Sequence, residues 1–235
     1  MILKNKTVLI TGGNSGLGFE ITKQLIKKKC KVIILGKNKK NVELAVKKLE
    51  TKLVKGVVCD LQNPEEINKV SKKLKIIDIL INCAGVINYG KLEDHSTSKI
   101  KELINVNLLG TIFTTREILL KMKKQNSGVI VNISSTSGLP SGGHPYESVY
   151  MASKFGVYGF SEGLKIELEE EKSQINVIGF YPGGMNTKLF AKAGLDKDTS
   201  KFMDPKEIAK IIVFILERPE SIKIDHILVN RNKNM

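Results

Sequence analysis

The sequence predicts an α/β fold, in which a doubly wound parallel sheet of about seven strands lies between two layers of helices, in a three-layer αβα arrangement. Three observations support this prediction. Short apolar runs rich in β-branched residues alternate with amphipathic segments. A glycine-rich stretch follows the first apolar run directly. No repeat, low-complexity tract or linker divides the chain, so we expect a single domain over residues 1–235.

The first third of the chain has the pattern of strand–helix units. TVLIT at 7–11, KVIIL at 31–35 and LVKGVV at 53–58 are apolar runs of strand length. FEITKQLIKKK at 19–29 and NVELAVKKLE at 41–50 have the apolar spacing of amphipathic helices. This alternation indicates βαβ units, a parallel sheet and helices on both of its faces.

The rest of the chain continues the same alternation. Asp204 and Pro205 suit the N-cap and the first helical position of the last expected helix. After the amphipathic stretch 63–74, the expected strands are at about 78–83, then 128–134, 175–181 and 224–229, and the expected helices are at about 97–125, 149–172 and 203–217.

The formal charge of +14 at pH 7 raises the possibility of a nucleic-acid-binding protein. However, only three of the 38 basic residues are arginine, and lysine is the weaker residue for bidentate recognition of bases and phosphates. The lysines are spread over the faces of predicted helices instead of gathering in one arm. We therefore expect a solvated basic surface and no nucleic-acid partner.

Composition also bounds the location of the protein. With 41% hydrophobic residues the chain can form a core, but no apolar run has the length of a membrane span, and the N-terminus lacks the pattern of a signal peptide. Cys30, Cys59 and Cys83 have no metal-binding spacing and are odd in number. We expect reduced thiols, no metal site, no membrane association and a cytoplasmic protein.

The stretch TGGNSGLG at 11–18 lies between the first strand and the first helix. Glycine permits a tight turn and a close approach of the backbone, and a helix N-terminus offers free N–H groups to a phosphate. The spacing of Gly12, Gly16 and Gly18 differs from the G-x-G-x-x-G form. A phosphate-binding loop is the hypothesis, and a purely structural turn is the alternative.

Tyr150 and Lys154 are one helical turn apart, and no other tyrosine of the chain has a lysine at i+4. Lowering the pKa of a phenol from about 10 to about 7 requires roughly 4 kcal/mol. A cation about 4 Å away, at an effective dielectric constant near 20, supplies energy on that order. The pair therefore predicts a phenol whose pKa is lowered for proton transfer, with an ordinary surface pair as the alternative.

Six motifs in order carry a family resemblance: TGGNSGLG, NCAG at 82–85, VNLLG at 106–110, ISS at 133–135, Tyr150-x-x-x-Lys154 and PGGMNT at 182–187. Together they resemble the short-chain dehydrogenase/reductase family over about residues 6–230. The resemblance implies a Rossmann-like sheet and an NAD(P)(H)-dependent oxidoreductase that acts on a small carbonyl or alcohol. It also implies a homodimer or a homotetramer.

The resemblance implies a set of dinucleotide contacts distributed over the same motifs. The glycine loop surrounds the pyrophosphate, Asp60 contacts the adenine, Lys154 contacts the nicotinamide ribose, and Asn82 steadies the central sheet. The residues implied to bind the cofactor are Gly12, Asn14, Ser15, Gly16, Leu17, Gly18, Lys37, Asp60, Leu61, Asn82, Ala84, Gly85, Tyr150, Lys154, Pro182, Gly183 and Thr187.

The end of the second strand bears on the choice of dinucleotide. An acid at that position binds the ribose hydroxyls of NAD and repels the 2′-phosphate of NADP. Gly36 stands there instead, and Lys37 follows. This pattern favours NADP(H) over NAD(H), unless Lys37 is simply one more surface lysine.

The resemblance also implies the catalytic roles. Ser135 polarises the substrate oxygen, with Ser134 as the second choice, and Tyr150 is the general acid and base. Asn107, in preference to Asn105, holds a water that links Lys154 to solvent. The implied catalytic residues are Asn107, Ser135, Tyr150 and Lys154.

Two loops are expected to select the substrate. The lysine-rich segment 188–202 suits a mobile lid, and the insertion at 138–149, with His144 and Tyr146, suits the mouth of the site. A 3-oxoacyl or 3-hydroxy acid compound is one candidate substrate. A non-catalytic dinucleotide-binding regulator of the same fold is the alternative function, and an epimerase or dehydratase is disfavoured because the short C-terminal region leaves little room for an extra substrate domain.

Overall fold

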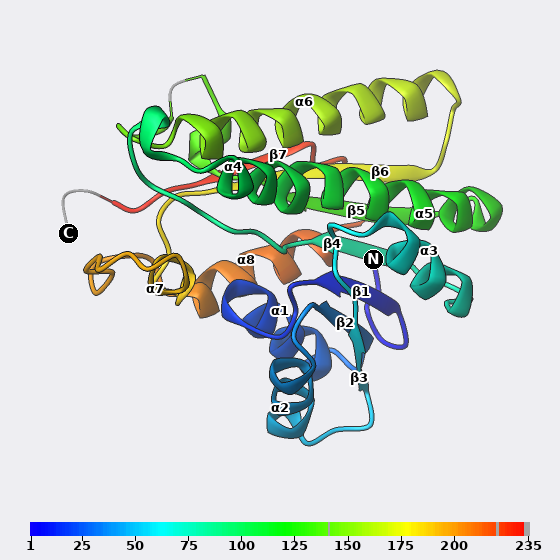
Figure 1. Cartoon of the computed structure of the whole chain (residues 1–235). Helices are drawn as coiled ribbons and strands as arrows, with labels where there is room; N and C mark the ends of the chain where they lie inside the picture. The colour runs from blue at the N-terminus through cyan, green and yellow to red at the C-terminus, as the bar shows by residue number, and fades with distance from the viewer. Residues whose placement is uncertain (141, 220, 233–235) are drawn as a thin grey trace.

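A computed structural model describes residues 1–140, 142–219 and 221–232. It has one parallel sheet of seven strands in the order β3-β2-β1-β4-β5-β6-β7, which confirms the predicted fold class (Figure 1). The strands are β1 (Thr7–Thr11), β2 (Lys31–Gly36), β3 (Val54–Val58), β4 (Ile79–Asn82), β5 (Gly128–Ile133), β6 (Ile175–Pro182) and β7 (His226–Val229).

Helices cover both faces of this sheet, as Figure 1 shows. Helices α1, α2 and α8 lie on one face, and α3, α5 and α6 lie on the other (Figure 1). The α-helices are α1 (Gly16–Lys27), α2 (Lys39–Leu49), α3 (Pro64–Lys73), α4 (Thr97–Ile104), α5 (Gly110–Gln125), α6 (Ser148–Glu170), α7 (Leu189–Lys192) and α8 (Pro205–Leu216). Short turns η1 (Leu92–Asp94) and η3 (Thr136–Gly138) are 3₁₀ helices, and η2 (Asn105–Leu109) is a π helix.

Two hydrophobic cores follow from the alternation of side chains along each strand. On β1, Val8 and Ile10 join the core beneath α1 and α8, and Leu9 joins the core beneath α5 and α6. On β4, Ile79 and Ile81 are likewise in the first core. Each central strand is therefore buried on both faces, which is why the strands read as continuous apolar runs.

Polar side chains fix the starts of three helices. Asn38 caps α2 by accepting the N–H of Asn41 at 3.0 Å, and Asn63 caps α3 in the same way. Asp204 accepts the N–H of Lys206 at 2.8 Å and Pro205 begins α8, as the sequence predicts. These caps satisfy N–H groups that have no partner within the helix.

The expected continuous helix at 97–125 contains a π turn that the sequence did not predict. Its central residues, Asn105–Leu109, form η2, and the N–H of Gly110 bonds to the carbonyl of Asn105. A π turn inserts one extra residue into the helix and is frequent at functional sites. Here the inserted turn contains Asn107.

The same helical stretch, Thr97–Gln125, is long and apolar enough to cross a membrane by length and composition, with a mean hydropathy of 1.2. In the structure 44% of its most apolar window is buried inside the protein. The stretch covers one face of the sheet (Figure 1), so it has the position of a core helix.

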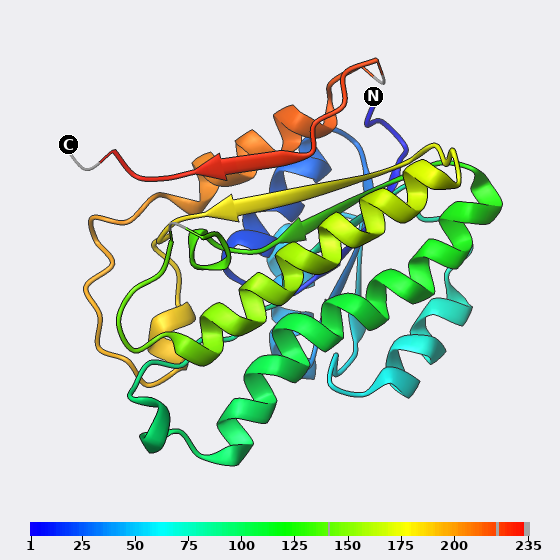
Figure 2. The ribbon, with the colours of Figure 1, turned by 90° about the horizontal axis from the view of Figure 1, so that it is seen from above.

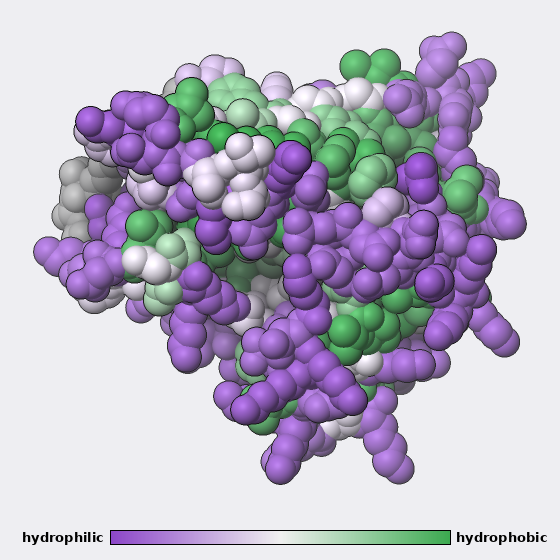
Figure 3. Space-filling model, viewed as in Figure 1, coloured by the Kyte–Doolittle hydropathy of each residue, from purple (hydrophilic) through white to green (hydrophobic). Residues whose placement is uncertain are grey.

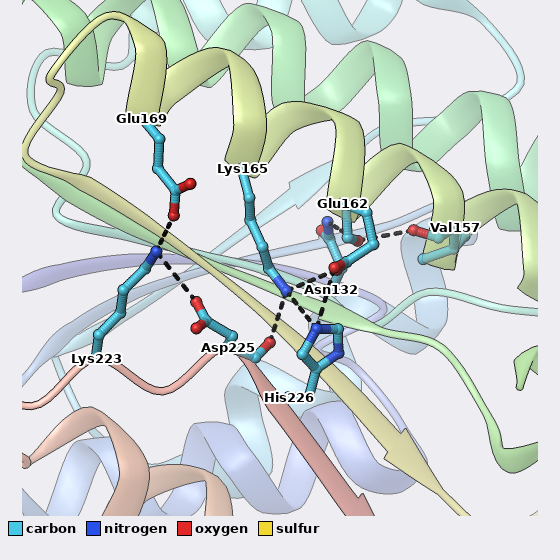
Figure 4. Close-up of polar contacts among 9 residues, drawn as sticks. Asn132, Val157, Glu162, Lys165, Glu169, Lys223, Asp225 and His226 are labelled. Atoms are coloured by element: carbon cyan, nitrogen blue, oxygen red, sulfur yellow. Dashed lines mark hydrogen bonds and ion pairs between the residues drawn. The ribbon is translucent and has the colours of Figure 1, made fainter.

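A polar network attaches β7 to the middle of α6 (Figure 4). The buried ammonium of Lys165 donates to Glu162 Oε1 at 2.7 Å and to the carbonyl of Asp225 at 2.9 Å, and it lies 3.1 Å from His226 Nε2. Further along α6, Glu169 forms an ion pair with Lys223, which precedes β7 (Figure 4). The edge strand and the long helix are therefore held together by charge as well as by packing.

Candidate active site

The carboxyl ends of the strands meet at the edge of the sheet where α6 begins and α7 lies (Figure 2). A cavity of about 310 Å³ opens at this edge. It is lined by Ile87, Tyr89, Ser134, Ser135, Thr136, Ser137, His144, Glu147, Tyr150, Pro182, Gly183, Gly184, Met185, Thr187, Leu189, Phe190, Lys197, Phe202, Asn230 and Arg231. The predicted Ser135, Tyr150, Pro182, Gly183 and Thr187 are thus brought into one site.

The glycine loop forms a cradle between β1 and α1. Gly12 and Gly16 have φ angles of +69° and +53°, which favour glycine. A Cβ on Gly12 would lie 2.8 Å from the Cα of Ala84, and a Cβ on Gly18 would lie 2.5 Å from the carbonyl oxygen of Gly12. Ser15 precedes α1 without a capping bond from its side chain. The loop thus leaves the helix N-terminus open to an anion.

The end of β4 closes the other side of this cradle. Thr11 Oγ1 accepts the N–H groups of Cys83 and Ala84, both at 3.0 Å. Asn82 donates to Asn132 Oδ1 at 2.8 Å and to Thr115 Oγ1 at 2.9 Å. The predicted role of Asn82 as a brace of the central sheet agrees with these two bonds, which link β4 to β5 and α5.

Tyr150 lies in the first turns of α6 and is only 8% exposed. Ser135 lies beside its phenol and favours the ionised form, which acts to lower the pKa of Tyr150. Ser135 Oγ also accepts the N–H of Ser137 at 3.1 Å, which fixes the serine at the start of η3. Of the two candidate serines, Ser135 is the one beside the phenol, whereas Ser134 Oγ donates to the carbonyl of Lys154 at 2.9 Å.

Lys154 is buried beneath Tyr150. Its Nζ donates to the carbonyl of Ile133 at 3.1 Å and lies 5.8 Å from the centroid of the Tyr150 ring. A Cβ placed on Gly85 would be 3.7 Å from this Nζ and 3.4 Å from Asn107 Oδ1. The ammonium, the amide oxygen and the backbone of Gly85 therefore lie together at the inner end of the site.

The expected lowering of the Tyr150 pKa by Lys154 is not found in this structure. Burial is the main influence and raises the pKa of Tyr150 to about 12, Ser135 opposes this increase, and Glu147 adds to it. Burial also lowers the pKa of Lys154 to about 8. Both shifts follow mainly from lost hydration, and the two groups are not among the causes of each other's shift.

Asn107 is held rigidly within the π turn. Its side-chain amide donates to the carbonyl of Val86 at 2.9 Å and to Ser153 Oγ at 3.0 Å, and its Oδ1 accepts the N–H of Val86 at 2.8 Å. Both amide N–H groups are used, so a water in the predicted relay would have to donate to Oδ1. Asn107 is 1% exposed, while the competing Asn105 is only half-buried.

Two predicted cofactor residues bind each other. Lys37 Nζ lies 2.8 Å from Asp60 Oδ2 in an ion pair between the ends of β2 and β3. Burial alone would raise the pKa of Asp60, but Lys37 and Gln62 together lower it below its usual value. A free lysine awaiting a 2′-phosphate was expected, and a lysine already paired with a carboxylate is found.

Not every predicted residue presents its side chain to the site. The side chains of Leu17 and Leu61 are buried in the two hydrophobic cores, so only their backbones could reach a ligand. Within the predicted insertion, His144 lines the cavity, but Tyr146 is 60% exposed and does not line it. Residue 141 of that insertion lies outside the described residues.

Sequence reasoning missed several residues of the site. Glu147 lines the cavity, is 3% exposed and accepts a hydrogen bond from Ser137 Oγ at 2.8 Å. Burial raises the pKa of its carboxyl group, which the His144 amide and Lys197 partly counteract. Arg231 enters the cavity from beyond β7. No local motif marks these residues, because only the tertiary fold brings them to the cavity.

Lys192 of α7 reaches the glycine loop from the opposite side. Its Nζ donates to Ser15 Oγ at 3.0 Å, and a Cβ on Gly16 would lie 3.6 Å from Thr187. The segment after β6 therefore contacts the predicted phosphate loop directly. The excess of lysine in this segment hid the contact in the sequence.

Comparisons with known proteins agree with this geometry. A sequence model of one family, described as short chain dehydrogenase, matches residues 6–198. An uncharacterised oxidoreductase of Staphylococcus aureus strain MW2 is 30% identical over 232 residues, which are 97% of this chain and 98% of that protein.

Solved structures are also similar. The closed form of a serine dehydrogenase complexed with NADP⁺ has a TM-score of 0.86 and 26% identity, with 95% of this chain and 94% of that chain covered. A short-chain dehydrogenase from Sphingobium yanoikuyae in complex with NADPH has a TM-score of 0.83 and 25% identity, with 95% and 87% covered.

Proposed function

The chain belongs to the short chain dehydrogenase family and is an oxidoreductase of that type, and from this premise we propose that it interconverts a carbonyl and a secondary alcohol with NADP(H). Tyr150 is the proposed general acid and base, and Ser135, Lys154 and Asn107 are its proposed partners. The observation that carries the proposal is that Tyr150 and Ser135 line one wall of a cavity next to the glycine cradle and interact with each other there.

The glycine cradle fits a dinucleotide. Side chains at Gly12 or Gly18 would collide with the backbone of the cradle, and the N-terminus of α1 faces the same space. A bound nicotinamide dinucleotide would supply or accept the hydride. We propose that the backbones of the glycine loop and of Ala84 and Gly85 hold it, with Lys192 as an additional cation near the pyrophosphate.

The side chains supply the proton chemistry. During reduction, Tyr150 would donate its phenolic proton to the carbonyl oxygen, and Ser135 Oγ would hold that oxygen beside the phenol. Because the pKa of Tyr150 is above neutral pH, the phenol is protonated there and is in the form that can donate. The buried charge of Lys154 would stabilise the phenolate that remains, and a water on Asn107 would return the proton.

Preference for NADP(H) over NAD(H) is part of the proposal. Gly36 at the end of β2 leaves no acid to repel a 2′-phosphate, and Lys37 is adjacent. The NADP-containing neighbours support this assignment by similarity. The Lys37–Asp60 pair opposes it, since a 2′-phosphate would have to compete with the Asp60 carboxylate.

We also propose that the enzyme is cytoplasmic and associates with itself through the layer formed by α5 and α6. The described chain has free cysteines at 30, 59 and 83, as expected for a reducing compartment. Leu120 and Ile166 are 58% and 67% exposed on these helices. Figure 3 shows an apolar area over this layer, of the kind that marks an interface.

The function is tested by following NADPH and NADH oxidation with a panel of aldehydes, ketones and 3-oxo acids. We expect carbonyl reduction with a higher kcat/KM for NADPH than for NADH. Tyr150→Phe should lower kcat by roughly 10²- to 10⁴-fold, because the proton donor is lost. Dinucleotide affinity, measured by calorimetry, should change little.

Tyr158→Phe is the matched control, because this tyrosine is on the same helix and packs against Tyr181 and His226 instead of the cavity. Full activity of Tyr150→Phe would refute the mechanism. Tight dinucleotide binding without turnover of any compound would instead favour a non-catalytic regulator.

A further inference from the structure

Aromatic rings fix one lysine of the segment after α7 over the cavity. Lys197 Nζ lies 4.9 Å from the ring centroids of Tyr89 and Phe190 and 5.7 Å from that of Phe202. The three rings come from the loop after β4, from α7 and from the approach to α8. Cation–π attraction therefore holds the ammonium in one place at the rim of the site.

The hydrogen-bonding capacity of this ammonium is unused. Within the described part of the chain, Lys197 Nζ makes no hydrogen bond and no ion pair. Among the four lysines of segment 188–202, Lys197 is the one that lines the cavity, while Lys192 is bonded to Ser15. Three N–H donors and a positive charge thus remain for a ligand in the cavity.

The other charged groups of the cavity decide which ligand is favoured. Arg231 is a second permanent cation in its lining. The carboxyl group of Glu147 accepts a bond from Ser137 Oγ and interacts with the His144 amide, and it also attracts the ammonium of Lys197. Because Ser137 and the His144 amide already share the charge of Glu147, an incoming anion would be received by Lys197 and Arg231, and these two cations favour a negatively charged ligand.

We propose that Lys197 binds the carboxylate of the substrate, so that the enzyme acts on small oxo acids and the corresponding hydroxy acids. The carbonyl would lie against Tyr150 and Ser135 at the inner end of the cavity, and the carboxylate would lie at the rim. A cavity of about 310 Å³ accommodates a small acid of this kind. This inference rests on the proposed function and adds the substrate class.

The test compares one acid with its uncharged ester: acetoacetate with methyl acetoacetate, both reduced with NADPH. The wild type should have the higher kcat/KM for the acid. Lys197→Met should reduce the acid-to-ester ratio about tenfold, the value of one charge-assisted hydrogen bond. Lys197→Arg should largely restore the ratio, because it keeps the charge.

Lys201→Met is the matched control, since Lys201 is exposed on the same segment and does not line the cavity. Its ratio should equal that of the wild type. Binding of 3-hydroxybutyrate and of its methyl ester to the NADP⁺-loaded protein, measured by calorimetry, tests the same preference without turnover. Reduction of neither compound would count against the proposed function, while calorimetry still tests Lys197.

An equal preference for acid in the wild type and in Lys197→Met would overturn the inference, and so would no preference in the wild type. Tighter binding of an amino alcohol by Lys197→Met would overturn it in another way. That result would mean that the three rings receive an ammonium from the substrate and that Lys197 only occupies its place.

Discussion

Burial of the Lys154 ammonium lowers the stability of the protein when no ligand is bound. Lys154 is 5% exposed, its Nζ donates one hydrogen bond among the described residues, to the carbonyl of Ile133, and burial lowers its pKa to about 8. Loss of hydration disfavours the charged form of a lysine. The site thus keeps a charge that is unfavourable for stability and that the proposed proton transfer would use.

This feature predicts a pH dependence of stability. Between pH 8 and 10.5, the unfolded chain keeps the Lys154 proton and the folded protein releases it. The unfolded state binds more protons, so the contribution of Lys154 to the free energy of unfolding rises with pH across this window. The total rise is roughly 3 kcal/mol.

Urea unfolding of the wild type and of Lys154→Met at several pH values measures this contribution as a difference, which removes the effect of the other lysines. The free energy of unfolding of the wild type should increase relative to that of Lys154→Met as the pH rises. A constant difference from pH 7 to pH 11 would show that the ammonium is better solvated than its burial indicates.

Individual residues of the site were predictable where a motif is local. The glycine loop, Ser135 and the Tyr150–Lys154 pair are each defined by a few neighbouring positions. The pairing of Lys37 with Asp60 was not, because it depends on β2 and β3 being neighbours in the sheet. Glu147 and Arg231 were missed because only the tertiary fold brings them to the cavity.

Helix α6 carries two of the proposed catalytic residues, Tyr150 and Lys154, near its start and is attached to the sheet along its length. Ser134 Oγ bonds to the carbonyl of Lys154, and Ser161 accepts from Asn132 at 2.9 Å. Farther along, Lys165 connects the helix to β7 (Figure 4). This series of bonds fixes the rotation of the helix, and with it the direction of the phenol.

Lys165→Met should therefore destabilise the protein by about 1–3 kcal/mol, because the carbonyl of Asp225 and the carboxylate of Glu162 lose a buried charged donor. Urea unfolding monitored by circular dichroism gives the value. The control is Lys223→Met, whose lysine is 50% exposed and should contribute less than about 1 kcal/mol. Equal effects of the two substitutions would show that burial of Lys165 is unimportant.

Most helices and strands were predictable to within a few residues, because both faces of the sheet are covered and the apolar runs are continuous. Several features were not, and two of them lie next to the site. Helix α1 begins at Gly16, before the expected residue 19, because glycines conceal its first turn. The π turn at Asn105–Leu109 adds a single residue, which does not interrupt the apolar pattern.

The alternation of strands and helices was enough to predict a doubly wound parallel sheet. Self-association is harder to predict, because the sequence alone does not distinguish an exposed apolar surface from the core. Leu120 and Ile166 have the apolar character of core residues but are exposed on α5 and α6. Their exposure, together with the apolar area in Figure 3, supports an interface on this layer.

Ile166→Glu should weaken self-association by placing a charge in the interface, where an unpaired carboxylate is unfavourable. Light scattering coupled to size exclusion should show a smaller species for Ile166→Glu than for the wild type at equal concentration. Leu44→Glu, at a 46% exposed position on α2, should leave the mass unchanged. A monomeric wild type, or an unchanged mass of Ile166→Glu, would contradict this interface.

Lys192 and Lys197, on either side of Leu195, lie at the proposed sites of two different ligands. Lys192 contacts Ser15 of the glycine loop, and Lys197 stands over the chamber where the acid would react. The short segment that carries both lysines therefore touches the dinucleotide site and the substrate site. We expect a movement of this segment at one site to alter binding at the other. We therefore expect an ordered kinetic mechanism, in which the dinucleotide binds before the substrate and dissociates last.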